Sequence, residues 1–556
     1  MASQIPGLEL IDLAPDGDAL VRDYHDGAES LAAFYAGSPW DPSAYARKAE
    51  EVDARFDAAD RAEVARMLRP AGDAARQRLD GWAEGRGLLV TTGQQPGLFG
   101  GPLYTIYKAL SAVRLAEALE RELDRPTLAV FWVASEDHDL AEVDHTWLLD
   151  RGNELRRVDL GVRHDGHDGR RARGASMANR PLGATVEDAL ETMRDVLPDS
   201  DFSGPLFDDL RAAYRPEASV ADAFTELLAR LLADQPIALI QASDPALKRR
   251  SLAVLRRELE HGAEHEARLR ARAEELEAAG YGVQVPILPD AENVFREAGG
   301  ARERLVREGG GWVTRQGGEH LERDALLREL EASPERFSPN VLLRPVVESA
   351  ALPTLAYVGG PAELRYFAEL GCLFDAHGIG MPLFLPRASF AVVESKVRKV
   401  LDKLHLEMET LRRPVHELAG RIAAEELPEE VEAALSQLRR DIGQSYGALQ
   451  KAAQTIDPTL KGPISSARSA SFAELDGAEK KIMRQLKEQN AVVIGQLEKA
   501  RVNLFPNDAP QERVLGPHQY LIRYGPAFLD MVAERCEVRL DRPAPEWTGV
   551  DCGGAA

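Results

Sequence analysis

The sequence predicts an α/β fold in which helices cover both faces of a parallel β-sheet, followed by a long α-helical coiled-coil arm. Over roughly the first 388 residues, short and almost continuous apolar runs alternate with helical patterns. Such alternation is typical of a parallel sheet that is buried on both faces. From about residue 389, apolar residues recur at spacings of three or four between charged faces, as in long helices that share an apolar seam.

Five apolar runs are predicted to form the strands of the sheet. They are 87–92 (GLLVTT), 127–135, 236–243, 354–360 and 381–386. Residues 1–85 are expected to be mainly helical, and a further helix is expected from Pro102 to about Glu122. Regions 140–225 and 281–330 interrupt the alternation, so we predict them to be insertions in a core that spans 1–388. Polar and apolar residues alternate in the second insertion, which favours a small antiparallel sheet there.

Residues 389–504 are predicted to form the helical arm. Its apolar seam begins with Phe390, Val393 and Val397; Pro414 should kink the first helix, and IDPTLKGP (456–463) should interrupt the arm. One helix alone cannot bury such a seam, so we expect a homodimer through the arm, with docking of the arm on the core as the alternative. Residues 505–556 are expected to return to the core.

Composition and charge exclude several functional classes. The 556 residues carry a formal charge of −23, which disfavours binding to nucleic acid or to an anionic membrane and means that an anionic substrate needs a locally basic pocket. No apolar run is long enough to span a bilayer, and no secretory signal is visible at the start of the sequence. The three cysteines form no disulfide or zinc pattern. We therefore expect a cytoplasmic protein with reduced thiols and no membrane partner.

The first candidate site is a glycine-rich stretch, TGQQPGLFGGPLYTIYKAL (92–110), between the first strand and its helix. Glycines allow a ligand to approach the backbone, and the start of a helix attracts anions. The stretch matches neither the Walker pattern nor GxGxxG, and the alternative is a tight structural turn. We predict that it binds substrate or nucleotide through Gly93, Gln94, Gln95, Gly97, Gly100, Gly101, Tyr104 and Lys108.

A second candidate site follows the second strand, in SEDHDLAEVDH (135–145). Asp137, His138 and Asp139 are candidate catalytic residues, and Glu136 is a candidate for binding, because crowded carboxylates around an imidazole suit a general base or a divalent metal. The alternative is a solvated acidic turn. The stretch lacks the three or four convergent ligands typical of zinc, so no tightly bound metal is predicted.

A third group of candidates surrounds the last two strands. Arginines here suit carboxylate or phosphate ligands, and a second glycine turn opens another helix. The alternative for any single arginine is a surface salt bridge. The predicted binding residues are Asn340, Arg344, Gly359, Gly360, Glu363 and Arg387.

Four stretches together resemble the family of bacillithiol-biosynthesis cysteine-adding enzymes, which are cysteine ligases. They are TGQQPGLFGGPLYTIYKA, FWVASEDHDLAEVDH, FSPNVLLRPVVESALPTLAYVGGPAELRYFAEL and LFPNDAPQERVLGPHQYLIRYG (504–525). The resemblance covers nearly the whole chain and includes the arm. It implies a nucleotide-binding Rossmann-like core, related to class I aminoacyl-tRNA synthetases, with connective insertions and a dimerising coiled coil.

The resemblance also implies a reaction, in which L-cysteine and glucosaminyl malate are joined by an amide bond. Amide formation from a carboxylate needs activation, so ATP or another nucleotide triphosphate is the expected co-substrate. The synthetase signatures HIGH and KMSKS are absent, which leaves adenylation and phosphorylation both open. Two other classes are alternatives: a metal-dependent amide or sugar hydrolase that uses the EDHD cluster, and a non-enzymatic dimeric scaffold with a vestigial nucleotide fold.

Overall fold

The computed structural model describes residues 4–15, 18–161 and 174–540. The chain divides into two compact units, one made of Met1–Val392 with Gln511–Ala556 and the other of Val393–Pro510. Most of the polar stretch RHDGHDGRRARGAS and the third cysteine, Cys552, lie outside the described residues.

The centre of the first unit is a six-stranded sheet in the order β14-β13-β3-β4-β7-β2. Five neighbouring strands run parallel: β14 (Leu383–Pro386), β13 (Thr354–Gly359), β3 (Leu88–Gln94), β4 (Thr127–Val133) and β7 (Ile237–Gln241). They coincide with the five predicted strands, and the predicted α/β fold class is confirmed. The short β2 (Arg69–Pro70) pairs antiparallel with β7 at one edge.

The strand order contains a switch in direction. Among the parallel strands, the chain starts in the middle with β3, continues outward to β4 and β7, and then crosses to the other side of β3 to form β13 and β14. Crevices outside the carboxyl ends of parallel strands at such a switch are where ligands bind in open α/β sheets. The fold therefore directs attention to the ends of β3 and β13.

Helices bury the sheet, whose central strands are mostly apolar and are buried along nearly their whole length. Leu128, Val130 and Trp132 of β4 belong to one hydrophobic cluster with residues of α11 (Pro245–Ala278), α13 (Arg344–Ala351) and α14 (Pro361–His377). The helix α5 (Tyr104–Leu123) packs against β3 and β4, and among the described residues it contributes none to that cluster. The predicted helix from Pro102 thus begins at Tyr104.

The N-terminal segment and the two insertions complete this unit. The first 85 residues form α1 (Ala19–His25), α2 (Pro42–Asp53), α3 (Ala58–Met67) and α4 (Asp73–Leu79), and also the strand β1 (Leu8–Asp12). The first insertion contains the hairpin β5 (His145–Leu149) and β6 (Leu155–Asp159), then α8 (Thr185–Val196), α9 (Ser203–Ala213) and α10 (Val220–Leu231). The second forms the predicted antiparallel sheet, from β8 (Ala291–Ala298), β9 (Ala301–Glu308), β10 (Gly311–Thr314) and β11 (His320–Leu321), with β12 (Phe337–Pro339) at its other edge.

The second unit is helical, as predicted, but the chain enters it through a strand that begins at the end of the first unit. Phe390 and Val393, expected on the first helix, lie in the strand β15 (Phe390–Glu394), which pairs with β1. Helix α15 (Ser395–Lys403) then ends well before Pro414, and α16 (Val415–Glu425) begins directly after it. Pro414 therefore separates two helices instead of kinking one, since it lacks the N–H that a continuous helix needs.

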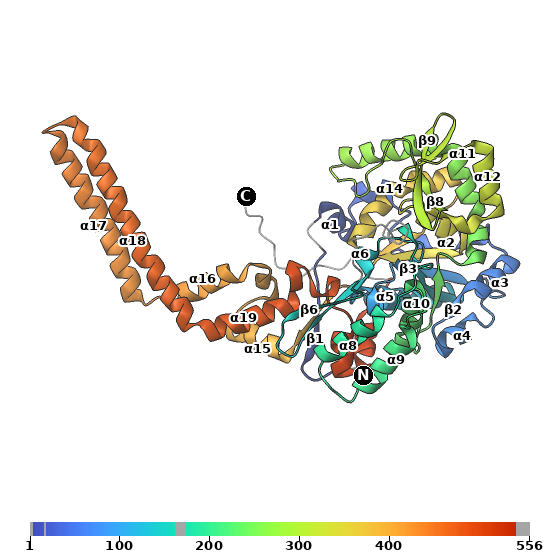
Figure 1. Ribbon diagram of the computed structural model, residues 1–556, viewed down its shortest axis with the longest axis horizontal. Coiled ribbons are helices and arrows are strands. Elements are labelled where there is room, and N and C mark those ends of the chain that lie inside the picture. The colour runs from blue at the N-terminus through green and yellow to red at the C-terminus, as the bar shows by residue number, and fades with distance from the viewer. Residues whose placement is uncertain (1–3, 16–17, 162–173, 541–556) are drawn as a thin grey trace. The chain divides into compact units, whose positions relative to one another are not determined.

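The longest helices of the second unit form an antiparallel pair. Helices α17 (Glu429–Gln454) and α18 (Lys461–Gln489) lie side by side, joined by the predicted interruption, and α19 (Ala491–Leu504) follows (Figure 1). The pair buries little of its seam, because Leu438 and Leu449 remain about half exposed, at 48% and 53%. Over the described residues, no helix combines the length and the apolar character that crossing a membrane requires.

Candidate active site

A cavity of about 580 Å³ opens at the carboxyl ends of β3, β4, β13 and β14. Its size lies in the range of small-molecule sites. Twelve of the predicted site residues line it: Gly93, Gln94, Gln95, Tyr104, Lys108, Glu136, Asp137, Asn340, Arg344, Gly360, Glu363 and Arg387. Three motifs that lie far apart in the sequence therefore meet at the topological switch of the sheet.

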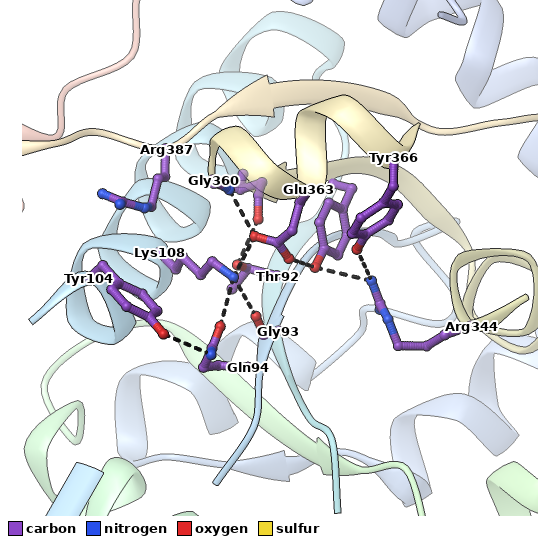
Figure 2. Close-up of polar contacts among 12 residues, drawn as sticks. Thr92, Gly93, Gln94, Tyr104, Lys108, Arg344, Gly360, Glu363, Tyr366 and Arg387 are labelled. Atoms are coloured by element: carbon purple, nitrogen blue, oxygen red, sulfur yellow. Dashed lines mark hydrogen bonds and ion pairs between the residues drawn. The ribbon is translucent and has the colours of Figure 1, made fainter. Parts of the chain in front are cut away.

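The centre of the cavity wall is an ion pair between Lys108 and Glu363 (Figure 2). Lys108 Nζ also donates to the carbonyl of Gly93 at 2.8 Å and to Gln94 Oε1 at 3.0 Å, so all three of its donors are in use. Burial lowers the pKa of Lys108, and the carboxylate of Glu363 opposes that shift. In this structure Lys108 joins the end of β3 to the start of α14 and does not present a free ammonium group to a ligand.

Glu363 links the second glycine turn to the same network. Its Oε2 accepts from the backbone N–H of Gly360 at 2.8 Å, and its Oε1 accepts from the hydroxyl of Tyr357. The first turn of α14, from Pro361, faces the cavity, and the first N–H groups of a helix have no acceptor within the helix. Gly359 lies one residue further back, where an added Cβ would stand 2.5 Å from the ring of Phe384. Gly360 is therefore the glycine of this turn that reaches the cavity.

The two predicted arginines are held by buried carboxylates. Arg344 pairs with Glu348 at 2.7 Å and donates to the hydroxyls of Tyr357 and Tyr366 at 3.2 and 3.0 Å. Arg387 forms a two-pronged pair with Glu512, at 2.6 and 2.9 Å, and its buried Nε has no partner among the described residues. Both guanidinium groups are thus fixed in position at the wall.

The EDHD residues turn toward different partners. Glu136 pairs with the buried Lys248, a residue that no sequence motif marked. Asp137 accepts from Gln95 Nε2 and from the N–H of His138, whereas Asp139 caps α6 (Leu140–Val143) and does not line the cavity. The expected crowding of three carboxylates around one imidazole is therefore absent. Over the described part of the chain, these residues do not form a convergent metal-ligand set.

Asp137 is ionised in the folded protein. Burial acts to raise its pKa, but hydrogen bonds from His138 and Gln95 and the charge of Arg302 lower it well below the usual range of a carboxyl. A carboxylate with so low a pKa is a weak proton acceptor at neutral pH, and it suits the binding of a cation such as a substrate ammonium group. His138 lies beside it, with Nδ1 at 3.5 Å from Asp137 Oδ1.

The second half of the glycine-rich stretch lies away from the cavity. Gly97, Gly100 and Gly101 are buried and absent from the cavity lining. The N–H of Gly100 donates to the hydroxyl of Tyr214 at 3.2 Å, and the carbonyl of Phe99 is bonded to His518 Nε2 at 2.7 Å. These glycines therefore hold together an interior turn outside the cavity, and their predicted role in binding substrate or nucleotide stays a prediction.

Asn340 reaches the cavity, but its side chain has structural partners. Its Oδ1 accepts from the backbone N–H groups of Leu342 and Leu343, just before α13, and its Nδ2 donates to Asn293 Oδ1 at 2.7 Å. The amide thereby fixes the entry to the helix that begins at Arg344.

Arg302 is the main charged residue of the cavity that sequence reasoning missed. It lies on β9, in the second insertion, with its guanidinium 4.0 Å from the ring centre of Phe295. It donates to Ser338 Oγ at 2.8 Å and to the carbonyl of Pro339 at 2.7 Å, and burial lowers its pKa to about 10. Alternating strand residues carry no motif that would have singled it out.

The lining residues carry more positive than negative charge. The five basic side chains are Lys108, Arg302, Arg344, Arg387 and Arg513, and the three acidic ones are Glu136, Asp137 and Glu363. Glu348 and Glu512 pair with Arg344 and Arg387 from behind the wall, but the lining itself keeps an excess of positive charge, which favours an anionic ligand in a protein of charge −23. Open α/β sheets bind their ligands at such a switch point, and the charge of this lining suits a small anionic ligand.

Comparison with known proteins gives the family. Residues 8–388 match the model described as bacillithiol biosynthesis BshC, N-terminal Rossmann-like domain, and residues 390–538 match the BshC C-terminal coiled-coil domain. The chain belongs to the BshC family of bacillithiol-biosynthesis enzymes, as its motifs had indicated.

Curated relatives agree with this assignment, and each carries the name "Putative cysteine ligase BshC". The relative from Salinibacter ruber is 34% identical over 538 residues, which cover 96% of both chains. The relative from Chlorobaculum tepidum is 34% identical over 81% of both chains. The relative from Koribacter versatilis is 35% identical over 80% of this chain and 81% of its own.

Proposed function

We propose that this enzyme adds L-cysteine to glucosaminyl malate through an amide bond, with ATP or another nucleotide triphosphate activating the cysteine carboxylate. The observation that carries the proposal is the basic cavity at the topological switch of the sheet, in a chain whose relatives are named as cysteine ligases. Both the nucleotide and the malyl group are anionic, so a site with an excess of basic side chains suits them.

The chemistry proceeds in two steps. A cysteine carboxylate oxygen attacks a phosphorus atom of the nucleotide, at Pα with loss of pyrophosphate or at Pγ with loss of the nucleoside diphosphate. The sugar amine then attacks the activated carbonyl carbon. The nucleotide monophosphate or phosphate leaves with the carboxylate oxygen, and the amine gives up a proton to a base.

The residues of the cavity, together with His138 beside it, suit separate tasks in this scheme. The N–H groups at the start of α14 and the guanidinium of Arg302 face the anionic groups. The ionised Asp137 binds the ammonium form of an amine, and the neighbouring His138 is the candidate acceptor of its proton. Lys108 and Glu363 keep the wall rigid, because each is held by several partners.

Isotope transfer tests the reaction and its mode of activation. Purified full-length enzyme is supplied with ATP, glucosaminyl malate and cysteine labelled with ¹⁸O in the carboxylate. The proposal predicts bacillithiol formation that requires all three substrates, with label in AMP if Pα is attacked or in inorganic phosphate if Pγ is attacked. Product formed without any nucleotide, or no product with any nucleotide triphosphate, would contradict it.

We also propose that the enzyme is a cytoplasmic homodimer through its helical unit. The half-exposed Leu438 and Leu449 on α17 give a second copy an apolar surface to cover. The double variant Leu438→Glu, Leu449→Glu should be a monomer, as measured by sedimentation velocity. The pair Gln437→Glu and Gln450→Glu, which changes neighbouring polar residues, is the control. A wild-type chain that sediments as a monomer at micromolar concentration would refute the dimer.

A further inference from the structure

Behind the cavity wall, three metal-binding side chains converge in the protein interior. Glu258 and His265 come from α11, and His377 is the last residue of α14. One ligand atom of each lies within 4.8 Å of the other two, and all three residues are buried. Neither the motifs nor the cavity include them.

The donor atoms converge on one carboxylate oxygen. Glu258 Oε2 lies 2.6 Å from His265 Nδ1 and 3.0 Å from His377 Nε2, and the two imidazole centres are 4.9 Å apart. The other oxygen, Oε1, accepts from Asn293 Nδ2 at 2.7 Å. Burial acts to raise the pKa of Glu258, but the hydrogen bonds of the two imidazoles lower it to about 2, so the carboxylate is ionised.

The local backbone departs from a regular helix between the two ligands of α11. Glu258 and His265 are seven residues apart, and in an ideal helix such residues lie about two turns from each other. Their side chains could not form a hydrogen bond across that distance without a distortion of the helix. His261 has non-helical angles, φ −125° and ψ 16°, and it lies between Glu258 and His265. This break inside a helix of 34 residues accompanies the convergence of the two side chains.

Two buried polar atoms in and beside the cluster, His377 Nδ1 and Glu292 Oε2, have no hydrogen-bond partner among the described residues. A Cβ added to Gly262, on α11 between Glu258 and His265, would lie 2.1 Å from Glu292 Oε2. Burial raises the pKa of Glu292 to about 7, although Trp312 and Arg307 both contact its other oxygen. A second buried carboxylate therefore lies next to the set with one oxygen unused.

We propose that Glu258, His265 and His377 bind a divalent transition metal of the zinc type, with Glu292, whose Oε2 faces Gly262 between two of these ligands, as a candidate further oxygen donor. Two imidazoles and a carboxylate are ligands that zinc prefers, and the hydrogen bond from Asn293 orients the carboxylate as second-layer partners of metal ligands do. The site would replace the expectation, drawn from the sequence, that the protein holds no tightly bound metal.

The position of the site assigns it a structural task. It joins α11 to the end of α14, whose first turn lines the substrate cavity. Asn293 bonds both Glu258 and Asn340, and Asn340 fixes the entry to the helix of Arg344. The metal would thus fix two elements of the cavity wall from behind, without contact with the substrates.

Metal content and cobalt substitution test the proposal on tag-free, full-length protein. After exposure to Zn²⁺ and desalting, we expect about one zinc ion per chain by mass spectrometry of the metal, and cobalt-loaded protein should show the visible absorption of four- or five-coordinate Co²⁺. His265→Gln and His377→Gln should each lower the zinc content at least tenfold. His261→Gln, at a half-exposed position of the same helix, should keep it, as should Asp137→Asn in the cavity.

A second measurement covers variants that fail to fold. Wild-type protein stripped with a chelator should melt several degrees lower, and Zn²⁺ should restore its melting temperature. Wild-type protein that takes up less than about a tenth of an equivalent of zinc would overturn the proposal. So would folded His265→Gln and His377→Gln variants that keep the wild-type zinc content. In either case the cluster would be a hydrogen-bonded group in which Glu258 accepts from both imidazoles.

Discussion

Two glycine turns follow neighbouring parallel strands in this protein, and they have different surroundings. The turn after β3 continues from the cavity at Gly93 into a buried loop, in which Gly100 and Gly101 have φ of +85° and +70° and Phe99 has φ of +51°. The turn after β13, at Gly360, opens α14 at the cavity and has ordinary extended angles. Glycine content alone therefore does not identify the turn that meets the ligand.

The difference follows from what each loop packs against. The loop at 97–101 lies against Tyr214 of the first insertion and His518 of the C-terminal segment, and their polar atoms bond its backbone groups. At Gly360, an added Cβ would make only ordinary contacts, 3.5 Å from Arg387 Nε and 3.7 Å from Glu363 Oε2. The first turn stabilises the interior, and the second leaves space beside charged side chains.

The largest expected effect concerns His518, the partner of the buried loop. Burial lowers its pKa to about 4, so the imidazole is neutral in the folded protein and free to protonate near pH 6.5 once unfolded. The unfolded state therefore binds more protons between these values, and stability falls as pH falls from 6.5 to 4. The loss amounts to about 3 kcal/mol for this residue.

The matched variant is His518→Gln, which keeps a donor for the carbonyl of Phe99 and does not titrate. Denaturant unfolding at pH 7, 6 and 5 should show a weaker pH dependence in the variant than in the wild type. Equal pH dependence in both proteins would mean that His518 is not buried and neutral in the fold.

The next effect separates two neighbouring carboxylates at the cavity. Asp137→Asn should lower kcat/KM about 10²-fold, because it removes the negative charge that binds the substrate amine. Asp139→Asn should leave kcat/KM near the wild-type value, because Asp139 only caps α6 and asparagine caps helices equally well. Steady-state ligation rates of the two variants decide the matter, and similar losses in both would favour a catalytic role for the whole cluster.

A smaller effect is expected at Arg302. Arg302→Lys keeps the charge but loses the paired contacts to Ser338 and Pro339, so we expect about a tenfold rise in KM for an anionic substrate, worth roughly 1.4 kcal/mol. Arg304→Lys is the control, since Arg304 also lies over Phe295, at 4.8 Å, but does not line the cavity. Equal increases in KM for both variants would mean that Arg304 contacts the substrate as Arg302 does, and would contradict the cavity lining.

Sequence patterns predicted the structural elements that depend on residues close together in the chain. The apolar runs of β3, β4, β7, β13 and β14 and the helical periodicity of the second unit depend on local residue order, and all were recognised. The sequence of β15 has the apolar spacing of a helix, but it forms a strand because it pairs with β1, which lies far from it in the sequence, near the N-terminus. An apolar spacing of three or four residues carries no information about pairing with a strand that is distant in the sequence.

The candidate site shows the same limit. Its motifs identified twelve lining residues, because polar side chains at the ends of parallel strands gather at one edge. The partners of those side chains could not be read from sequence: Lys108 meets Glu363, Arg387 meets Glu512, and Glu136 meets Lys248 only after folding. These pairings decide which charged groups remain available to a ligand.

The most direct test of the comparison is a pair of alanine substitutions, one in each glycine turn, measured for both melting temperature and kcat/KM. Gly101→Ala places a side chain at φ +70°, 3.2 Å from Thr105 Oγ1, and should cost about 1–2 kcal/mol of stability while kcat/KM stays near wild type. Gly360→Ala should leave the melting temperature unchanged and lower kcat/KM about tenfold, because its methyl group enters the ligand space. The opposite pattern, with catalysis lost at Gly101 and stability lost at Gly360, would contradict the placement of the ligand at the turn after β13.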